Sequence, residues 1–523
     1  MDEEEIISFR VHKLDGLRAR DVDPYPARSP LGPRKGSAWS IERIRRKAES
    51  DVDKTSLEYG QVARYPGSRT AIKYRIAGRI TGLRDTGAAI FADLRDLSGK
   101  IQLYFWRDWT YLSLVGRKRT HGNHESFDAL RSLFDIGDYI EVRGNAFRTQ
   151  RGELSIRVSR FTMLAKGIRR LPEKWHGLKD TETRYRQRYL DLISNPEVRE
   201  TFITRSRVIT AIRAFMDGQG FLEVETPVLV ADAGGAAARP FTTYHNALDR
   251  QLYLRIALEL YLKRLVIGGY DRVYEIGRIF RNEGASAKYN PEFTMLESYQ
   301  AYADYNDVMD MVERLVAAVA EEVIGGHTVA YAETKIDLAP PWPRVTLRDA
   351  VKQHSGVDFE EYADAESLQG AMVDAGVPFD PSWGRGKLID ELLSVKVEPN
   401  LVQPTFLTDY PVELSPLAKR KPENPRLVER FELFIAGREV GNAYSELNDP
   451  IEQRERMLKQ ARLRAEGDEE VELADEDFLV ALEHGMPPCG GLGIGIDRLV
   501  MALTGQSSIR EVILFPHLRE AQR

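Results

Sequence analysis

The strongest constraint on the fold is a short segment, residues 292–299 (EFTMLESY), in which Glu297 lies inside a strand-like pattern. A strand repeats every two residues, so Glu297 is expected on the same face as the large side chains at alternate positions: Phe293, Met295 and Tyr299. The carboxylate would then lie on a face that belongs to the core. Because an unpaired buried charge is costly, we expect a cationic partner for Glu297.

Two arginines lie in glycine-containing segments on either side of this strand. Arg281 and Glu283 flank the turn of FRNEG, and an arginine fork suits a bidentate contact with a carboxylate or phosphate. The run GGLGIGIDR ends in Arg498, and such a loop lets a nucleotide approach the backbone. GxGxG alone also mimics a dinucleotide fingerprint, but no βαβ pattern accompanies it here. A purely structural ion-pair network is the alternative for Arg281 and Glu283.

A second acidic constellation lies in FELFIAGREVGNAYSEL, residues 431–447. If the Ala-Gly pair at 436–437 forms a two-residue turn, Glu432 and Glu439 lie diagonally opposite each other on one face. Like charges this close are unfavourable unless a cation joins them, and carboxylates shared with phosphates are typical of magnesium. The pattern therefore predicts a Mg²⁺ site, with an exposed pair of glutamates as the alternative.

Three further polar residues follow on the same strand. Asn442, Tyr444 and Glu446 share a face, but strict alternation puts that face opposite Glu439. We expect a β-bulge at Gly441, because glycine tolerates the backbone angles that a bulge needs. The bulge would bring all of these side chains into one site.

The chain divides into segments of different periodicity. Residues 1–66 carry mixed charge and form an N-terminal appendage, whereas residues 67–166 alternate with a period of two between turns, which predicts an all-β barrel of the OB-fold type. Residues 167–195 are a linker, and residues 196–523 are long enough for a large second domain. A basic belt, residues 143–188, holds 13 Lys/Arg against four Asp/Glu, which suits either nucleic acid or a solvated surface.

Composition excludes several classes of protein. The only cysteine, Cys489, rules out an intramolecular disulfide and a CxxC metal site. The first residues are acidic where a secretory signal is basic, and no run of about 18 apolar residues occurs. We therefore expect a cytoplasmic protein with no membrane segment.

Several stretches resemble the bacterial-type lysyl-tRNA synthetases of class II. Residues 272–305 resemble motif 2 of that class and residues 490–503 resemble motif 3, while a helix expected at 205–217, with FLEVETPVL after it, is similar to motif 1. The stretches RYRQRYLDL, RIALELYLKRL and YPVELSPLAKR are also similar. The resemblance implies an α+β fold: a class II antiparallel sheet flanked by helices, preceded by an OB-fold barrel. It also implies a homodimer that uses ATP, L-lysine and tRNA(Lys).

The resemblance assigns roles to individual residues. The implied ATP-binding residues are Arg281, Glu283, Asn290, Phe293, Glu432, Glu439 and Arg498; Arg281 and Arg498 are the implied catalytic residues, and Glu432 and Glu439 the implied Mg²⁺ ligands. The implied lysine-binding residues are Gly235, Glu259, Arg281, Glu297, Tyr299, Asn442, Tyr444 and Glu446. The implied anticodon-binding residues are Arg84, Phe91, Gln102 and Glu153. Lysine carries two ammonium groups, so acidic side chains must meet both.

Five residues, in three places of the chain, depart from the family pattern. Lys288 and Tyr289 replace a frequent Arg-His pair, Leu258 stands where proline is usual, and Cys489 with Gly490 replaces a common Thr-Ala. Two other ligases remain open: a class II enzyme for aspartate or asparagine, which the acidic residues disfavour, and a lysyl-ligase paralogue that modifies protein, which the barrel disfavours. A catalytically inactive RNA-binding protein is a third alternative, which the retained arginines and glutamates disfavour.

Overall fold

The computed structural model describes residues 2–520 except 30–39, 55–72, 114–121, 150, 173–177, 237, 285 and 466–474. The chain divides into two compact units, Met1–Gly177 and Leu178–Arg523, each with a hydrophobic core of its own. The boundary expected near residue 66 lies outside the described residues.

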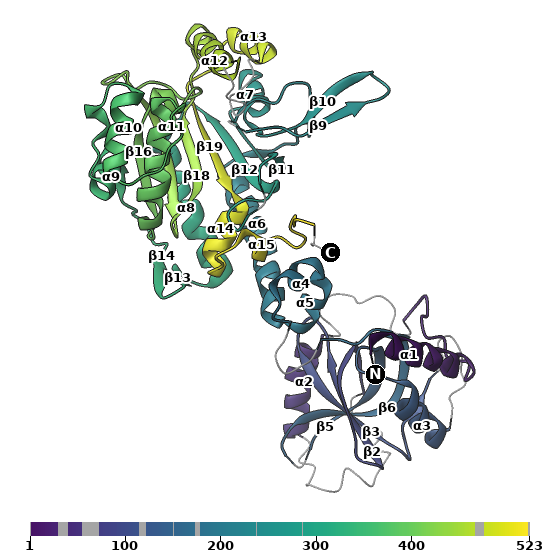
Figure 1. Ribbon diagram of the computed structural model, residues 1–523. Helices are drawn as coiled ribbons and strands as arrows, with labels where there is room; N and C mark the ends of the chain where they lie inside the picture. Colours follow the sequence, from purple (N-terminus) through teal and green to yellow (C-terminus); the bar gives the residue numbers. More distant parts are fainter. Residues whose placement is uncertain are drawn as a thin grey trace. The chain divides into compact units, whose positions relative to one another are not determined.

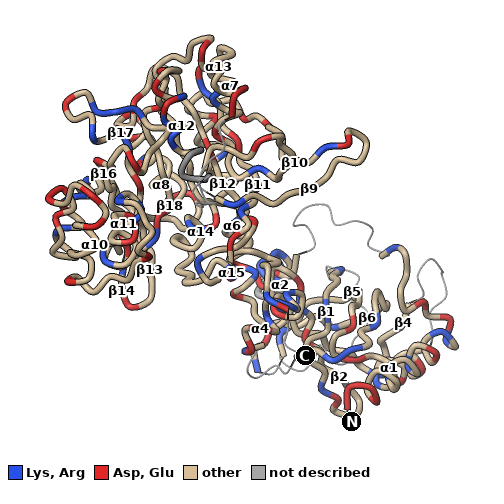
Figure 2. Tube along the Cα trace, turned by 45° about the horizontal axis from the view of Figure 1, so that its top comes forward, with Lys and Arg blue, Asp and Glu red and all other residues tan. Residues whose placement is uncertain are grey.

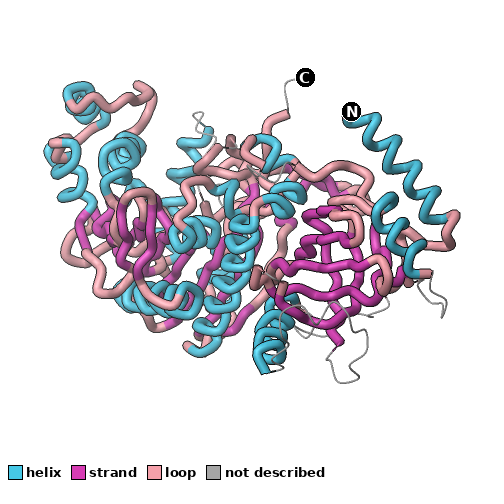
Figure 3. Tube along the Cα trace, turned by 90° about the horizontal axis from the view of Figure 1, so that it is seen from below, coloured by secondary structure: helices cyan, strands magenta, loops and turns pink. Residues whose placement is uncertain are grey.

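The first unit is a closed β-barrel (Figure 3). Its strands pair in the order β3-β2-β1-β5-β6-β4, and a β3–β6 pairing closes the sheet. The strands are β1 (Lys73–Asp85), β2 (Ala89–Arg95), β3 (Lys100–Trp106), β4 (Tyr111–Leu112), β5 (Tyr139–Arg148) and β6 (Leu154–Ala165). This confirms the expected OB-type barrel.

Three helices accompany the barrel: α1 (Glu3–Arg18), α2 (Ile41–Lys54) and α3 (Asn123–Leu133). Leu17 of α1, Ile44 of α2 and Leu130 of α3 are buried in the same cluster as barrel residues such as Ile76 and Val142. The described part of the N-terminal segment therefore contributes to the core of the barrel.

The second unit is built on an eight-stranded sheet in the order β15-β16-β17-β18-β19-β12-β11-β7 (Figure 1). Neighbouring strands are antiparallel except for the pairs β15–β16 and β11–β7. The strands are β7 (Leu222–Glu223), β11 (Arg272–Phe280), β12 (Glu292–Ala301), β15 (Arg344–Thr346), β16 (Thr405–Pro411), β17 (Leu427–Ile435), β18 (Arg438–Ser445) and β19 (Cys489–Gly495). The strand expected at 292–299 is confirmed as β12.

The two faces of this sheet are covered by different helices. The helices α6 (Pro196–Gly218), α8 (Tyr305–Ile324) and α14 (Ile496–Thr504) share one buried cluster with Leu296 of β12. Tyr299, on the opposite face of β12, packs in a second cluster with α7 (Glu259–Ile267) and α13 (Glu476–Glu483). The alternation of β12 thus separates the main core from the α7 face, where Glu297 points.

Smaller elements complete the second unit. A three-stranded sheet has the order β8-β10-β9, and a two-stranded one joins β13 and β14. These strands are β8 (Leu229–Val230), β9 (Thr242–His245), β10 (Arg250–Leu254), β13 (Thr328–Tyr331) and β14 (Thr334–Asp337). The remaining helices are α4 (Thr181–Arg186), α5 (Arg188–Ser194), α9 (Leu347–Ser355), α10 (Ala365–Asp374), α11 (Arg385–Leu392), α12 (Pro450–Ala465) and α15 (Ile509–Val512).

Charged residues of both signs are interspersed along both units (Figure 2). Within the ranges that the structure describes, no helix is long and apolar enough to cross a membrane.

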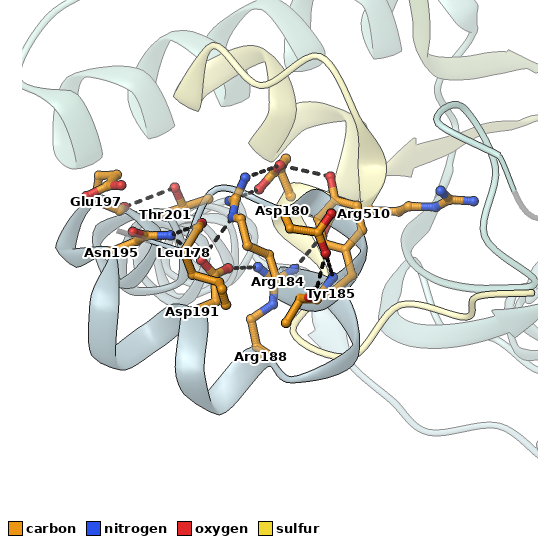
Figure 4. A network of polar contacts seen from close by, with 12 residues as sticks. Leu178, Asp180, Arg184, Tyr185, Arg188, Asp191, Asn195, Glu197, Thr201 and Arg510 are labelled. Carbon is orange, nitrogen blue, oxygen red and sulfur yellow. Dashed lines mark hydrogen bonds and ion pairs between the residues drawn. The ribbon is translucent and has the colours of Figure 1, made fainter. Parts of the chain in front are cut away.

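The helices α4 and α5 are tied to the C-terminal segment by a polar network (Figure 4). Arg188 is fully buried and donates hydrogen bonds to the carbonyl oxygens of Arg510 (2.8 Å) and Leu514 (3.0 Å). Arg184 pairs with Glu511 at 2.9 Å. Buried arginines bonded in this way hold irregular backbone in place, because its carbonyl oxygens would otherwise lack partners.

Candidate active site

The hairpin of β17 and β18 carries the two carboxylates expected to hold a metal ion. Its turn residues, Ala436 and Gly437, have φ angles of 57° and 69°, the left-handed region that a two-residue hairpin turn uses. The register shifts beyond the turn: Gly441 pairs with Leu433, and Val440 becomes the extra residue of a β-bulge. The bulge expected at Gly441 is therefore confirmed, with Val440 as the unpaired residue beside it.

This bulge decides which side chains share a face. Glu432 pairs with Asn442, and Glu439 pairs with Phe434, two positions after Glu432. Because side chains two positions apart in a strand point the same way, Glu432, Glu439 and Asn442 lie on one face, with Tyr444 next along it. The bulge brings together residues that regular pairing would have separated.

The two hairpin carboxylates already have protein partners. Glu432 accepts hydrogen bonds from the Tyr410 hydroxyl (2.8 Å) and from Arg430 (2.6 Å), and Glu439 pairs with Arg498 at 2.9 Å. Burial raises the pKa of Glu432 to about 7, with the charge of Glu439 adding to the effect and that of Arg430 opposing it. A cation between the two carboxylates would remove part of this cost.

The donor set fits a hard divalent cation that is shared with phosphates. In the described part of the chain, no three or more His, Cys, Asp or Glu side chains are grouped so as to hold a metal ion. Magnesium in nucleotide sites is usually bound through one or two carboxylates, and phosphate oxygens and waters complete its coordination. Glu432 and Glu439 would supply such a pair.

Arg281 lies just beyond β11, with its guanidinium carbon 5.3 Å from the centre of the Phe293 ring. Its Nε donates a hydrogen bond to the Ile256 carbonyl oxygen (3.3 Å). Burial lowers the pKa of Arg281, while the charges of Glu283 and Glu439 oppose that shift. Glu283 itself is exposed. A partly desolvated guanidinium gains strongly from an anionic guest.

Two other expected nucleotide residues have different surroundings. Arg498 lies in the first turn of helix α14, with its guanidinium carbon 6.0 Å from the ring of Tyr289, one of the residues that departs from the family pattern. Asn290 is buried, donates to the Glu292 carbonyl oxygen (2.6 Å) and accepts from the His517 N–H (3.1 Å). The Asn290 amide therefore orders its own segment and the C-terminal one.

Glu297 is buried on the α7 face of β12. It accepts hydrogen bonds from the backbone N–H of Leu258 (3.0 Å) and from the Tyr299 hydroxyl (3.1 Å). Burial raises the pKa of Glu297 to about 7, and the charge of Glu259 adds to the shift. Among the described residues, these two neutral donors hold the carboxylate and the charge of Arg281 also acts on it, so the cationic partner of Glu297 stays a prediction. Proline, which is usual in the family at position 258, could not make this bond.

Glu259 and Glu446 both pair with Lys263 on α7, a residue that was not predicted from the sequence. Lys263 Nζ lies 2.5 Å from the Glu259 carboxylate and also forms an ion pair with Glu446. The Tyr444 hydroxyl donates to Glu259 at 2.7 Å. The two glutamates and the lysine are buried. Only the four-residue spacing of Glu259 and Lys263, which puts them on one helix face, could have been read from the sequence.

Two glycines leave room for these carboxylates. Gly235 has φ 89°, and a Cβ there would lie 3.3 Å from the Cβ of Glu259. A Cβ on Gly491 of β19 would lie 1.8 Å from Glu446 Oε1, a distance that no side chain can accept. Gly491 is therefore a steric requirement of the acidic site, whereas Gly235 is favoured by its left-handed backbone conformation.

The model of the tRNA synthetases of class II (D, K and N) matches residues 180–519. The chain belongs to this family. A second model, an OB-fold nucleic acid binding domain, matches residues 74–164 of the synthetase. Both matches agree with the class II sheet and the barrel described above.

Curated relatives of this class II synthetase align over almost its whole length. Lysine–tRNA ligase of Moorella thermoacetica is 53% identical over 517 residues, covering 99% of this chain and 98% of the relative. Lysine–tRNA ligase of Pelotomaculum thermopropionicum is 56% identical, with 99% and 96% covered. That of Bacillus subtilis is 50% identical, with 98% and 97% covered.

The four residues expected to bind the anticodon lie together on the synthetase barrel. Arg84 and Phe91 are cross-strand neighbours on β1 and β2, with the guanidinium carbon 5.1 Å from the ring centre. Gln102 of β3 donates to Glu153 at 3.0 Å. Tyr104 lies 5.1 Å from Phe91, centroid to centroid, and extends the aromatic surface. Stacking and polar groups on a barrel face suit single-stranded RNA.

Arg430 is a second site residue of the synthetase that could not be identified from the sequence. It donates to Asn442 Oδ1 (3.1 Å) and to Glu432 (2.6 Å), with its guanidinium carbon 4.5 Å from the Tyr410 ring. Because Oδ1 of Asn442 accepts from Arg430, the orientation of the Asn442 amide is fixed and its nitrogen faces away from Arg430 as a donor. The sequence offers no signal for this role beyond alternate spacing.

Proposed function

We propose that the chain is a lysine–tRNA ligase, which activates L-lysine with ATP to lysyl-adenylate and then transfers lysine to the 3′ end of tRNA(Lys). The observation that carries the proposal is the group of three buried carboxylates, Glu259, Glu297 and Glu446, of which Glu297 also interacts with the charge of Arg281. Glu259 raises the pKa of both other glutamates, and Arg281 lowers that of Glu297, so the four groups interact electrostatically. The acidic side chains suit the two ammonium groups of lysine, and Arg281 suits its carboxylate. The names of the curated relatives support this choice.

The first step requires no general base, because the lysine carboxylate is already ionised at neutral pH. It attacks the α-phosphate in line, and pyrophosphate leaves. The residues act by position and charge: Arg281 binds the carboxylate and the α-phosphate, Asn442 binds the carboxylate, and Arg498 binds the γ-phosphate. Glu432 and Glu439 would hold Mg²⁺, which neutralises phosphate charge when bound.

The remaining site residues select the two substrates. Those proposed for the adenine and ribose are Glu283, Asn290 and Phe293. Those proposed for the lysine α-amino group are Gly235 and Glu259, and those for the ε-ammonium and its alkyl chain are Glu297, Tyr299, Tyr444 and Glu446. A buried carboxylate left unpaired by a neutral side chain is costly, so such amino acids should be rejected.

The proposal extends to the organisation of the molecule. Residues 67–166 would bind the anticodon through Arg84, Phe91, Gln102 and Glu153, residues 167–195 would link the domains, and residues 196–523 would form the catalytic domain. We also propose a cytoplasmic homodimer. The exposed apolar side chains of Leu222, on the edge strand β7, and of Leu229 support an interface.

The two alternative ligases make different demands. An aspartate or asparagine enzyme needs a cation or amide donor at the side-chain end, where this site has Glu297 and Glu446. A protein-modifying paralogue has no need of the barrel. ATP–pyrophosphate exchange with each amino acid, followed by charging of purified tRNA, separates all three cases.

In that experiment we expect exchange with lysine above every other amino acid, and transfer to tRNA(Lys). Glu446→Gln should reduce kcat/KM for lysine by about 100-fold with little loss of stability. Glu313→Gln is the matched control, because Glu313 is also buried but lies on α8, where it binds the Trp342 N–H. Preferred exchange with aspartate, or none with any amino acid, would refute the proposal.

A further inference from the structure

Lys263 lies among the described residues of the proposed lysine site, but no substrate contact accounts for it. It is fully buried on α7 and forms ion pairs with Glu259, one helical turn earlier, and with Glu446, which follows β18. Its Nζ also lies 5.6 Å from the Tyr444 ring centre and 5.8 Å from that of Phe478. An ammonium so enclosed is stable only because charged and aromatic partners replace water.

Glu446 has capacity for a second cation. It is 1% exposed, and apart from its ion pair with Lys263, which involves Oε2, no hydrogen bond to its carboxylate is found among the described residues. Burial raises the pKa of Glu446 well above its ordinary value, while Lys263 opposes the shift and Glu259 and Glu297 add to it. A buried acceptor left open in this way indicates that a guest donor completes it.

The charges of the site can be counted. When ionised, as binding of a cationic guest favours, Glu259, Glu297 and Glu446 contribute three negative charges, and Lys263 contributes one positive charge. Two negative charges remain, which equals the number of ammonium groups on lysine. The substrate carboxylate has its own partner in Arg281, which the count leaves aside.

We propose that Lys263 is a positioning residue that sets the net charge of the lysine site: it holds Glu259 and Glu446 in place and neutralises one of three carboxylates, so that two guest ammonium groups complete the balance. The inference rests on the proposed function and adds to it a residue that need not touch the substrate. A merely structural lysine would be required in every background. A charge-setting lysine is required only while all three carboxylates are present.

The test is a double-mutant cycle in ATP–pyrophosphate exchange with the full-length enzyme. Lys263→Met alone removes the cation that joins Glu259 and Glu446, so the two carboxylates repel each other and leave their positions, and the lysine KM should rise about tenfold or more. Glu446→Gln alone leaves one net negative charge and also raises the lysine KM. The double variant restores two net negative charges.

The sign of the Lys263→Met effect should therefore reverse. In the Glu446→Gln background the substitution should lower the lysine KM, whereas in the wild type it raises it. The ATP KM should stay constant throughout. Lys263→Arg keeps the charge, so its lysine KM should lie closer to that of the wild type than the KM of Lys263→Met does.

Lys166→Met provides the matched control. Lys166 is equally buried and pairs with two carboxylates, Asp135 and Asp138, but it lies in the barrel. Its loss should leave the lysine KM unchanged in both backgrounds. If Lys263→Met alone fails to fold, the comparison of Glu446→Gln with the double variant still decides.

A double variant with a lysine KM equal to or above that of Glu446→Gln would overturn the inference. That failure is distinct from failure of the proposed function, which would show as absence of lysine-dependent exchange in the wild type. A wild type active on lysine with no reversal of sign leaves the ligase intact and removes only the role of Lys263.

Discussion

Glu297 illustrates at the scale of one residue how a binding site costs stability. Burial raises its pKa from 4.5 to about 7, so the folded protein binds a proton that the unfolded chain has lost. Stability from this group is present below pH 4.5 and is lost as pH rises to about 7, a difference of about 3 kcal/mol. Glu297→Gln should therefore raise the unfolding free energy of the ligand-free protein at pH 8, but hardly at pH 4.5, while abolishing lysine activation. Denaturant unfolding at the two pH values measures this, and an equal effect at both would contradict it.

A second prediction at the residue scale concerns Gly491. A Cβ there would lie 1.8 Å from Glu446 Oε1 and 2.7 Å from Tyr299 Cε1, so Gly491→Ala must displace the carboxylate. A displacement of about 1 Å typically costs on the order of 100-fold in catalysis, and we expect that loss in kcat/KM for lysine. Gly370→Ala is the control, since nothing lies within 4 Å of its added Cβ. Exchange kinetics of the two variants should differ; similar values would remove Glu446 from the site.

At the scale of elements, the C-terminal segment depends on α5. Arg188 donates hydrogen bonds to the carbonyl oxygens of Arg510 and Leu514 and pairs with Asp191. Arg188→Met leaves these buried polar groups without a partner and should lower the free energy of unfolding by about 3–5 kcal/mol. Residues 509–515 should then exchange amide hydrogens faster, and the ATP KM should rise because His517 binds Asn290. Arg213→Met, at an exposed ion pair with Glu223, should cost under about 1 kcal/mol. Unchanged exchange in residues 509–515 would show that Arg188 does not hold the segment.

At the scale of the whole molecule, two units with separate cores should unfold in two steps. Lysine with ATP should raise the free energy of unfolding of Leu178–Arg523 only. The increase should be about 2.7 kcal/mol when the ligand concentration is 100 times its dissociation constant. An anticodon stem-loop RNA should raise the free energy of unfolding of Met1–Gly177 only. Calorimetry with each ligand tests this, and a single transition, or equal shifts of both, would contradict it.

Much of the candidate site follows from local rules. A period of two places Glu297 and Tyr299 on one face of β12, and the Ala-Gly turn with its bulge sets the register of Glu432 against Asn442. These depend only on neighbours in sequence, because pleat and turn geometry act over a few residues. The donor to Glu297, the Leu258 N–H, could not be predicted from these rules, because it comes from a separate segment.

What the sequence by itself determined is the set of elements, the faces of their side chains and the family. Only the tertiary structure decided that Lys263 meets Glu446, that Arg430 fixes the Asn442 amide and that Gly491 must lack a side chain. The physical reason is that periodicity shows which residues share a face but not which faces meet. Desolvation, which raises the pKa values of Glu297, Glu432 and Glu446, depends on what covers each face.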